Sequence, residues 1–145
     1  MDRKPKKIKN FNFLPVGISN FNGNEKMFFP KYHGVSYGIY NWSNENSDEI
    51  VVEMRTINDL AAENNFKFID VLKMDIEGSE FSVIKDLNFD DLEFGQILIE
   101  FHERFIENGN QLLNECLEIL ENKGYKCFAI SDDYEYSFVN VKLIN

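Results

Sequence analysis

Helix-like and strand-like segments alternate between residues 57 and 124, and this alternation constrains the fold more than any other feature. Hydrophobic periodicity predicts helices at 57–65, 79–87 and 110–124, with strands at 68–75 and 95–102. Each helix in such a series carries the chain back to begin the next strand in the same direction. The pattern therefore predicts an α/β fold with a mostly parallel sheet.

The two predicted central strands carry apolar side chains on both faces. In the strand at 68–75 these residues are Ile69, Val71, Leu72 and Met74, and the strand at 95–102 shows the same pattern. Because neighbouring residues of a strand point to opposite faces, both faces of these strands are apolar. Such strands are typical of parallel sheets covered on both sides, so we expect both strands to be buried on two faces.

Further strands are expected on either side of this alternating region. Those before it are predicted at 11–19, 26–30, 34–42 and 49–56. The segments at 125–131 and 136–144, joined through Asp132 and Asp133, predict an antiparallel hairpin that closes the sheet.

Capping residues define the ends of two predicted helices. Thr56 and Asn110 are expected N-caps, and Gly124 is expected to end the last helix. The apolar stripe of that helix comprises Leu113, Cys116, Leu117 and Leu120. Two cysteines are too few for a disulfide framework or a metal knuckle, so we expect Cys116 and Cys127 to be small buried hydrophobic residues.

Length and charge limit the functions that are open to the chain. Its 145 residues correspond to a single domain, 1–145, and its hydrophobic content of 43% is enough for a core. A formal net charge of -10 disfavours nucleic-acid binding. No apolar run approaches the roughly 18 residues of a membrane span, and no signal peptide is evident. We therefore expect a cytoplasmic protein without nucleic-acid or membrane partners.

Charged side chains follow both predicted central strands at the point where each strand ends. Asp75 and Glu77 follow the first strand, and Glu100 and His102 end the second. Ligands of open α/β sheets bind outside the carboxyl ends of the strands. If the two strands are neighbours, these side chains converge on one rim beside a cleft.

Each neighbouring charged or flexible residue also has a purely structural interpretation. Lys73 can pair with a carboxylate, Gly78 can permit a tight turn, and Glu80 can complement a helix dipole. Carboxylates beside an imidazole suit a divalent cation, but the sequence contains no fixed ligand motif. We therefore assign no residue as a metal ligand, and a carboxylate-rich metal-binding α/β domain remains an alternative.

Three segments resemble the FkbM-type methyltransferases. The segment "LKMDIEGSEFSVIKDL" resembles the family's Lys-x-Asp-x-Glu-Gly-x-Glu signature on the fourth strand of a Rossmann-like S-adenosylmethionine fold. The segment "ILIEFHERF" is similar to the next strand, and "FLPVGISNFNGNEKMFFP" is similar to the third strand with its following turn. The resemblance extends over nearly the whole chain.

The resemblance implies S-adenosylmethionine as cofactor and a set of site residues. The implied catalytic residues are Asp75, Glu100 and His102; the implied cofactor-binding residues are Ser19, Asn20, Asp75 and Glu77; the implied structural or positioning residues are Lys73, Gly78 and Glu80. The implied reaction is methyl transfer to a hydroxyl of a sugar, glycan or secondary metabolite. The implied partner is a small-molecule or glycan acceptor.

The chain departs from the family pattern at its amino-terminal side. No Asp/Glu-x-Gly-x-x-x-Gly turn occurs in its 145 residues, and the segments matching the family begin after the first two strands. The first strand would neighbour the strand at 68–75, so we expect that strand to have an unpaired edge. We accordingly expect weak cofactor binding by this chain, and a homo-oligomer or an amino-terminal partner segment. A non-catalytic or partner-dependent remnant of the fold is the other alternative.

Overall fold

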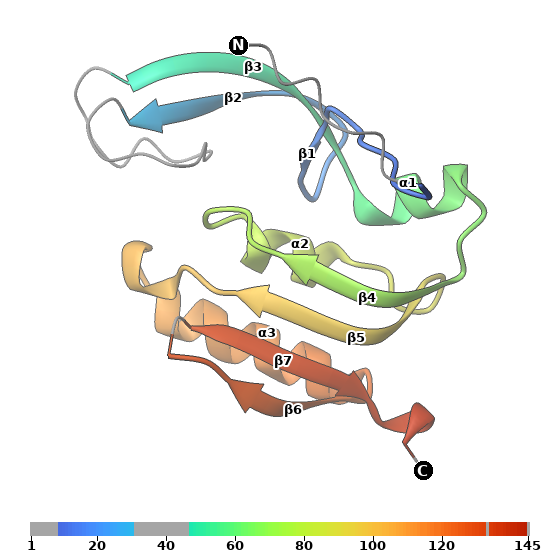
Figure 1. Ribbon diagram of the computed structural model, residues 1–145. Helices are drawn as coiled ribbons and strands as arrows, with labels where there is room; N and C mark the ends of the chain where they lie inside the picture. The colour runs from blue at the N-terminus through green and yellow to red at the C-terminus, as the bar shows by residue number, and fades with distance from the viewer. Residues whose placement is uncertain (1–8, 31–46, 133, 145) are drawn as a thin grey trace.

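The computed structural model describes residues 9–30, 47–132 and 134–144, which form two β-sheets and three α-helices (Figure 1). The smaller sheet contains β1 (Gly17–Ile18), β2 (Gly23–Pro30) and β3 (Ser47–Arg55) in the order β1-β3-β2. β1 runs parallel to β3, and β2 pairs with β3 in the antiparallel direction. The predicted strand at 34–42 lies outside the described residues.

The predicted strand at 11–19 is much shorter than expected. Only Gly17 and Ile18 pair with β3, and residues 11–16 have no regular structure. Pro15 lies in this segment and has no backbone N–H to donate to a neighbouring strand. The side chains of Phe11 and Phe13 are exposed, so no packing compensates for the missing pairing.

The larger sheet holds the alternating region of the sequence. Its elements follow in the order α1 (Ile57–Glu63), β4 (Phe68–Met74), α2 (Glu80–Asp86), β5 (Glu93–Glu100), α3 (Gly109–Asn122), β6 (Tyr125–Ile130) and β7 (Glu135–Asn140). Two short 3-10 turns, Glu103–Phe105 and Val141–Leu143, follow β5 and β7. The strand order is β4-β5-β7-β6, so β4 forms an edge of this sheet among the described residues, as expected.

The expectation of a mostly parallel sheet is wrong. β4 and β5 are parallel, but β7 pairs in the antiparallel direction with both β5 and β6. The predicted closing hairpin is confirmed. It is also the cause of the mixed sheet, because the short connection between β6 and β7 can join antiparallel strands only.

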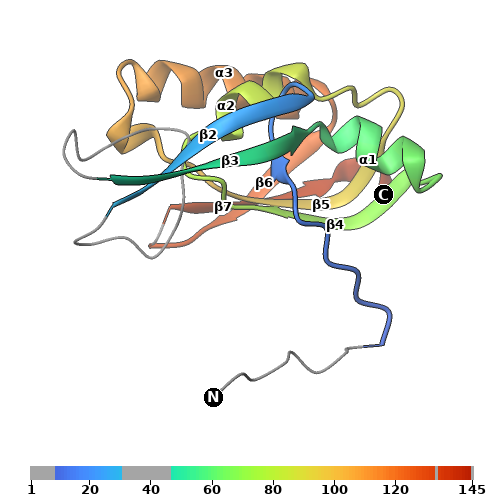
Figure 2. The same cartoon turned by 90° about the horizontal axis from the view of Figure 1, so that it is seen from above.

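The larger sheet is covered by helices on one face. α2 and α3 lie against that face, and no helix of the described segments lies on the opposite one (Figures 1 and 2). Val71 of β4 is 51% exposed, whereas Met74 is 4% exposed. In β5, Ile97 and Ile99 are completely buried, while Gln96 between the strand's apolar residues is exposed. The predicted burial of both faces of these two strands is therefore wrong.

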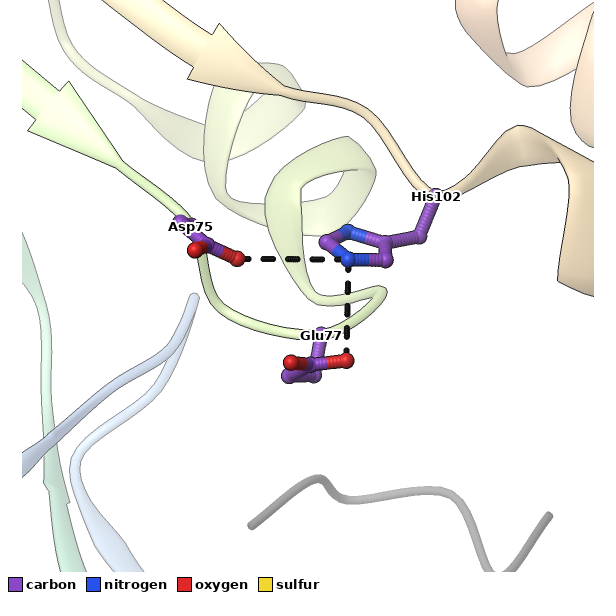
Figure 3. Close-up of side chains that lie close together, drawn as sticks. All are labelled: Asp75, Glu77 and His102. Carbon is purple, nitrogen blue, oxygen red and sulfur yellow. Dashed lines mark ion pairs between the residues drawn. The ribbon is translucent and has the colours of Figure 1, made fainter. Parts of the chain in front are cut away.

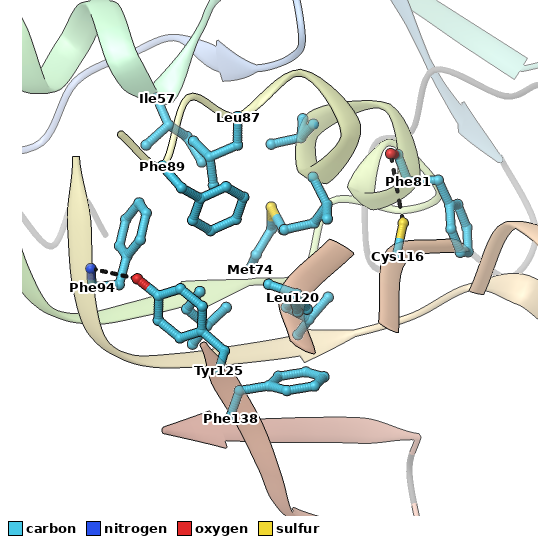
Figure 4. Packing of buried hydrophobic residues seen from close by; sticks show 14 of the residues in the cluster. Ile57, Met74, Phe81, Leu87, Phe89, Phe94, Cys116, Leu120, Tyr125 and Phe138 are labelled. Carbon is cyan, nitrogen blue, oxygen red and sulfur yellow. Dashed lines mark hydrogen bonds between the residues drawn. The ribbon is translucent and has the colours of Figure 1, made fainter. Parts of the chain in front are cut away.

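The core lies between this sheet and its two helices, and it confirms the predicted apolar face of α3, of which only Leu117 is partly rather than fully buried. α2 contributes Phe81 and Ile84, and α3 contributes Leu113, Cys116 and Leu120 (Figure 4). Each large apolar side chain that is fully buried contributes roughly 1.5–3 kcal/mol to the free energy of unfolding. These contacts fix the position of α2, and with it the turn between β4 and α2.

The observed helix ends match the predicted ones in part. The Thr56 side chain accepts a hydrogen bond from the Asp59 backbone, so its predicted cap is confirmed, and Gly124 follows α3 with a φ of 88°. Asn110 is not the N-cap of α3, because the helix begins one residue earlier and Asn108 takes that position. A Cβ on Gly109 would lie 1.9 Å from the Glu103 carbonyl oxygen, so only glycine fits at this start.

The two cysteines have different environments. Cys116 is buried, as predicted, and its Sγ donates to the Phe81 carbonyl at 3.7 Å (Figure 4). The prediction that Cys127 is buried is wrong. It lies on β6, the outer strand of the hairpin, whose side chains after Tyr125 are all exposed.

We expect one thiol of the folded protein to react with a thiol-specific reagent. Burial raises the pKa of the Cys116 thiol to about 12, so the reactive thiolate is scarce at neutral pH. Mass spectrometry after iodoacetamide treatment should show one modification in buffer and two in denaturant. A Cys127→Ser variant should show none in buffer, and labelling of Cys116 in that folded variant would contradict the packing described above.

None of the helices in the described segments is both long and apolar enough to span a bilayer.

Candidate functional site

The polar side chains after β4 and β5 meet at one edge of the larger sheet. The two strands are parallel neighbours, and Met74 pairs with Ile99 near their carboxyl ends. Asp75 therefore lies beside the segment Glu100 to His102, as Figure 3 shows for Asp75 and His102. The convergence predicted from the sequence is confirmed.

His102 lies at the centre of four carboxylates, which together we call the acidic rim: Asp75, Glu77, Glu80 and Glu100. Its Nε2 lies 3.5 Å from an oxygen of Glu77, 3.8 Å from one of Glu100 and 3.9 Å from one of Asp75. Its Nδ1 lies 3.0 Å from Glu80 Oε1. Each ring nitrogen therefore has its own carboxylate neighbours.

The turn between β4 and α2 places two of these carboxylates. Glu77 and Gly78 both have positive φ values, 54° and 103°, so the chain reverses sharply there. Glycine adopts this conformation freely, whereas at Glu77 it costs roughly 1–2 kcal/mol. The turn directs the Glu77 side chain toward His102, as seen in Figure 3.

Glu80 holds this turn together from inside the protein. It is completely buried, and its carboxylate accepts hydrogen bonds from the backbone N–H of Ile76 at 3.0 Å and of Gly78 at 3.0 and 3.1 Å. The same carboxylate contacts His102 Nδ1. Glu80 therefore does more than complement the helix dipole, because it joins the end of β4 to the end of β5.

The surroundings of His102 determine its protonation. Burial by itself would lower the pKa of His102, but the hydrogen bond that His102 donates to Glu80 and the charges of Glu80, Glu77 and Glu100 outweigh it. The pKa of His102 is therefore raised above its ordinary value. Since the Glu80 carboxylate already accepts backbone hydrogen bonds, Nδ1 is the donor in its contact with His102, and Nε2 faces the rest of the acidic rim.

Asp75 is the member of the acidic rim that is most open to solvent. Its side chain is 46% exposed, compared with 28% for Glu77, 26% for Glu100 and 6% for His102. A molecule that approaches this edge of the sheet therefore meets Asp75 first, with His102 behind it.

Other residues singled out from the sequence have hydrogen-bond partners outside the acidic rim. Lys73 forms an ion pair with Glu135 of β7, and this hydrogen bond raises the pKa of Lys73. Ser19 and Asn20 line a small separate hollow, where Asn20 donates to the Asp86 carboxylate at 2.6 Å. Their role in cofactor binding stays a prediction.

One residue of the site was not singled out from the sequence. Arg104 lies 3.5 Å from Glu100 and donates to the Phe101 carbonyl at 3.2 Å. Its guanidinium also lies 4.7 Å from the ring centres of Phe105 and Tyr134. The four-residue spacing between Glu100 and Arg104 was the one sequence feature that could have indicated this ion pair. It does so only if the segment after β5 forms a turn.

An apolar hollow of about 270 Å³ lies beside the acidic rim. Its walls come from α1, β4 and the segment around β1, and they end at Ile76, the residue after Asp75. The residues that line it include Leu14, Ile18, Ile57, Leu60, Leu72 and Met74. An apolar group bound there would lie next to the carboxyl end of β4.

Comparison with known proteins identifies the family. The model of the methyltransferase FkbM domain matches residues 6–127, which is well over half of the chain. The chain belongs to the FkbM methyltransferase family. No curated protein and no solved structure matches it significantly.

The family suggests S-adenosylmethionine as the cofactor, and the residues of this FkbM domain fit one end of it. The exposed Asp75 and the adjacent apolar hollow fit a reacting methyl group and an apolar part of the molecule. The acidic glycine-rich turn that would hold the methionine part does not occur in these 145 residues. The residues of this chain therefore fit only the reacting end of S-adenosylmethionine.

Proposed function

We propose that this FkbM domain, with a Rossmann-like methyltransferase fold, transfers a methyl group from S-adenosylmethionine to a hydroxyl of a sugar, glycan or secondary metabolite. The observation that carries the proposal is the exposed carboxylate of Asp75 at the carboxyl end of β4, backed by the buried His102 from the end of β5. Family membership supports methyl transfer, and the acidic rim supports a hydroxyl acceptor.

The proposed roles follow from exposure and contacts. The cofactor, when bound, supplies an electrophilic methyl group on sulfonium. Asp75 accepts the proton of the acceptor hydroxyl as that oxygen takes the methyl group, because its carboxylate is the most accessible base of the acidic rim. His102 positions Asp75 from behind, and Glu80 positions His102. Glu100 and Arg104 form the side of the site next to β5.

The charge of the site favours a neutral, hydroxyl-rich acceptor. Carboxylates accept hydrogen bonds from hydroxyl groups and repel phosphate or carboxylate groups on a ligand. Four carboxylates surround His102, so an anionic acceptor would meet repulsion at the point of reaction. We therefore expect neutral sugars and polyols to be better acceptors than their phosphate esters.

Methyl transfer can be measured directly with a labelled donor. The protein is incubated with methyl-labelled S-adenosylmethionine at millimolar concentration, so that weak binding does not limit the reaction, and with matched neutral and phosphorylated acceptors. We expect label on a hydroxyl oxygen of a neutral acceptor, located by mass spectrometry. If the folded protein labels no acceptor, the non-catalytic alternative is the better account.

A further inference from the structure

Part of the acidic rim has the composition of a divalent-cation site. One ligand atom each from Asp75, Glu77 and His102 lies within 4.8 Å of the others (Figure 3). Carboxylate oxygens and an imidazole nitrogen together suit Mg²⁺, Mn²⁺ and related ions.

The buried histidine points to a cation independently of the acidic residues. His102 is 4% exposed, and its Nδ1 is held by the completely buried Glu80. Its Nε2 faces the carboxylates of Asp75, Glu77 and Glu100 at 3.5–3.9 Å, so it points to the open side of the acidic rim. A carboxylate behind a histidine in this way is typical of metal-binding histidines, because it fixes the ring and its tautomer.

The balance of charge points the same way. Four carboxylates surround a single imidazole, and two cations offset part of their charge: Arg104 at Glu100, and Lys73, whose charge acts on Asp75 and Glu100. Carboxylates this close repel one another, and the repulsion is strongest where burial reduces the screening by water. A divalent ion between Asp75 and Glu77 would relieve this repulsion where the acidic rim opens to solvent.

We propose that Asp75, Glu77 and His102 bind one divalent cation of the Mg²⁺ and Mn²⁺ class. Binding of the ion does not depend on methyl transfer. Its use in the reaction rests on the proposed function: a cation beside the acceptor hydroxyl stabilises negative charge on that oxygen as its proton leaves. The ion would then assist Asp75 in the same step.

Mn²⁺ is a suitable probe because its binding is seen directly by electron paramagnetic resonance. We expect one Mn²⁺ per chain, displaced by excess Mg²⁺. Asp75→Asn and Glu77→Gln should each weaken Mn²⁺ binding at least about tenfold, and Glu80→Gln should weaken it by about 10–100-fold through the orientation of His102. Asp70→Asn, an exposed carboxylate of the same strand β4, serves as the matched control and should bind as the parent does.

A second measurement on the parent protein locates the ion without any variant. Mn²⁺ should first broaden the amide NMR signals of residues 75–80 and 100–104. Absence of binding at millimolar Mn²⁺, or broadening that spares these residues, would overturn the cation site. Methyl transfer that continues in the presence of a chelator would overturn the role of the ion in the reaction while leaving the proposed function intact. Mn²⁺ binding without methyl transfer would leave the cation site intact and overturn the proposed function.

Discussion

Replacing Asp75 with asparagine is expected to slow methyl transfer by about 10²–10⁴-fold, the usual contribution of a general acid-base group. The melting temperature should not fall, because the side chain is 46% exposed and contributes nothing to the core. The substitution also removes one negative charge from the acidic rim. Steady-state methyl-transfer rates at saturating donor, with thermal unfolding of the same samples, measure both effects.

The control for this substitution is Asp70→Asn. Asp70 is an exposed aspartate on the same strand, so the change in charge and chemistry is identical, but it lies far from His102 along β4. Its rate should equal that of the parent protein. An Asp75→Asn protein that melts normally and turns over at nearly the parental rate would remove Asp75 from the mechanism. Failure of that protein to fold would instead favour a structural role.

Replacing Glu80 with alanine is expected to lower the free energy of unfolding by about 3–5 kcal/mol, the usual cost of removing one partner of a buried charged pair. The substitution leaves the backbone N–H groups of Ile76 and Gly78 and the Nδ1–H of His102 without their acceptor. Equilibrium unfolding in urea, followed by circular dichroism, measures the loss.

Two further variants separate the hydrogen bonds of Glu80 from its charge. Glu80→Gln keeps one acceptor oxygen, so its loss of stability should be smaller than that of the alanine variant. Glu118→Ala removes an exposed carboxylate from α3 and should change the free energy of unfolding by less than about 0.5 kcal/mol. If Glu80→Ala were no more destabilising than Glu118→Ala, the turn would not depend on Glu80.

The sequence predicted the elements that depend on local patterns. The helix face built on Leu113, Cys116 and Leu120 is buried as expected, because a 3.6-residue period leaves few alternatives. The N-cap at Thr56 also depends only on neighbouring residues, so it was predictable for the same reason. The meeting of Asp75 with His102 was also predictable, since it needed only two consecutive parallel strands to be neighbours.

Features that depend on distant parts of the chain were not predictable in this way. The exposure of Val71 and Cys127 depends on what covers the second face of the sheet and the outer strand of the hairpin, and no local pattern contains that information. The start of α3 depends on the contact between Gly109 and the Glu103 carbonyl. The burial of Glu80 depends on where His102 lies, so its sequence position at a helix start suggested a weaker role.

The central claim is that methyl transfer takes place at the carboxyl ends of β4 and β5. A crystal structure with S-adenosylhomocysteine and a neutral acceptor from the activity assay tests it most directly. We expect the acceptor hydroxyl within hydrogen-bond reach of the Asp75 carboxylate, about 2.6–3.2 Å, and about 3–3.5 Å from the position of the transferred methyl group. A cofactor product bound elsewhere on the protein, with Asp75 facing solvent alone, would contradict the claim.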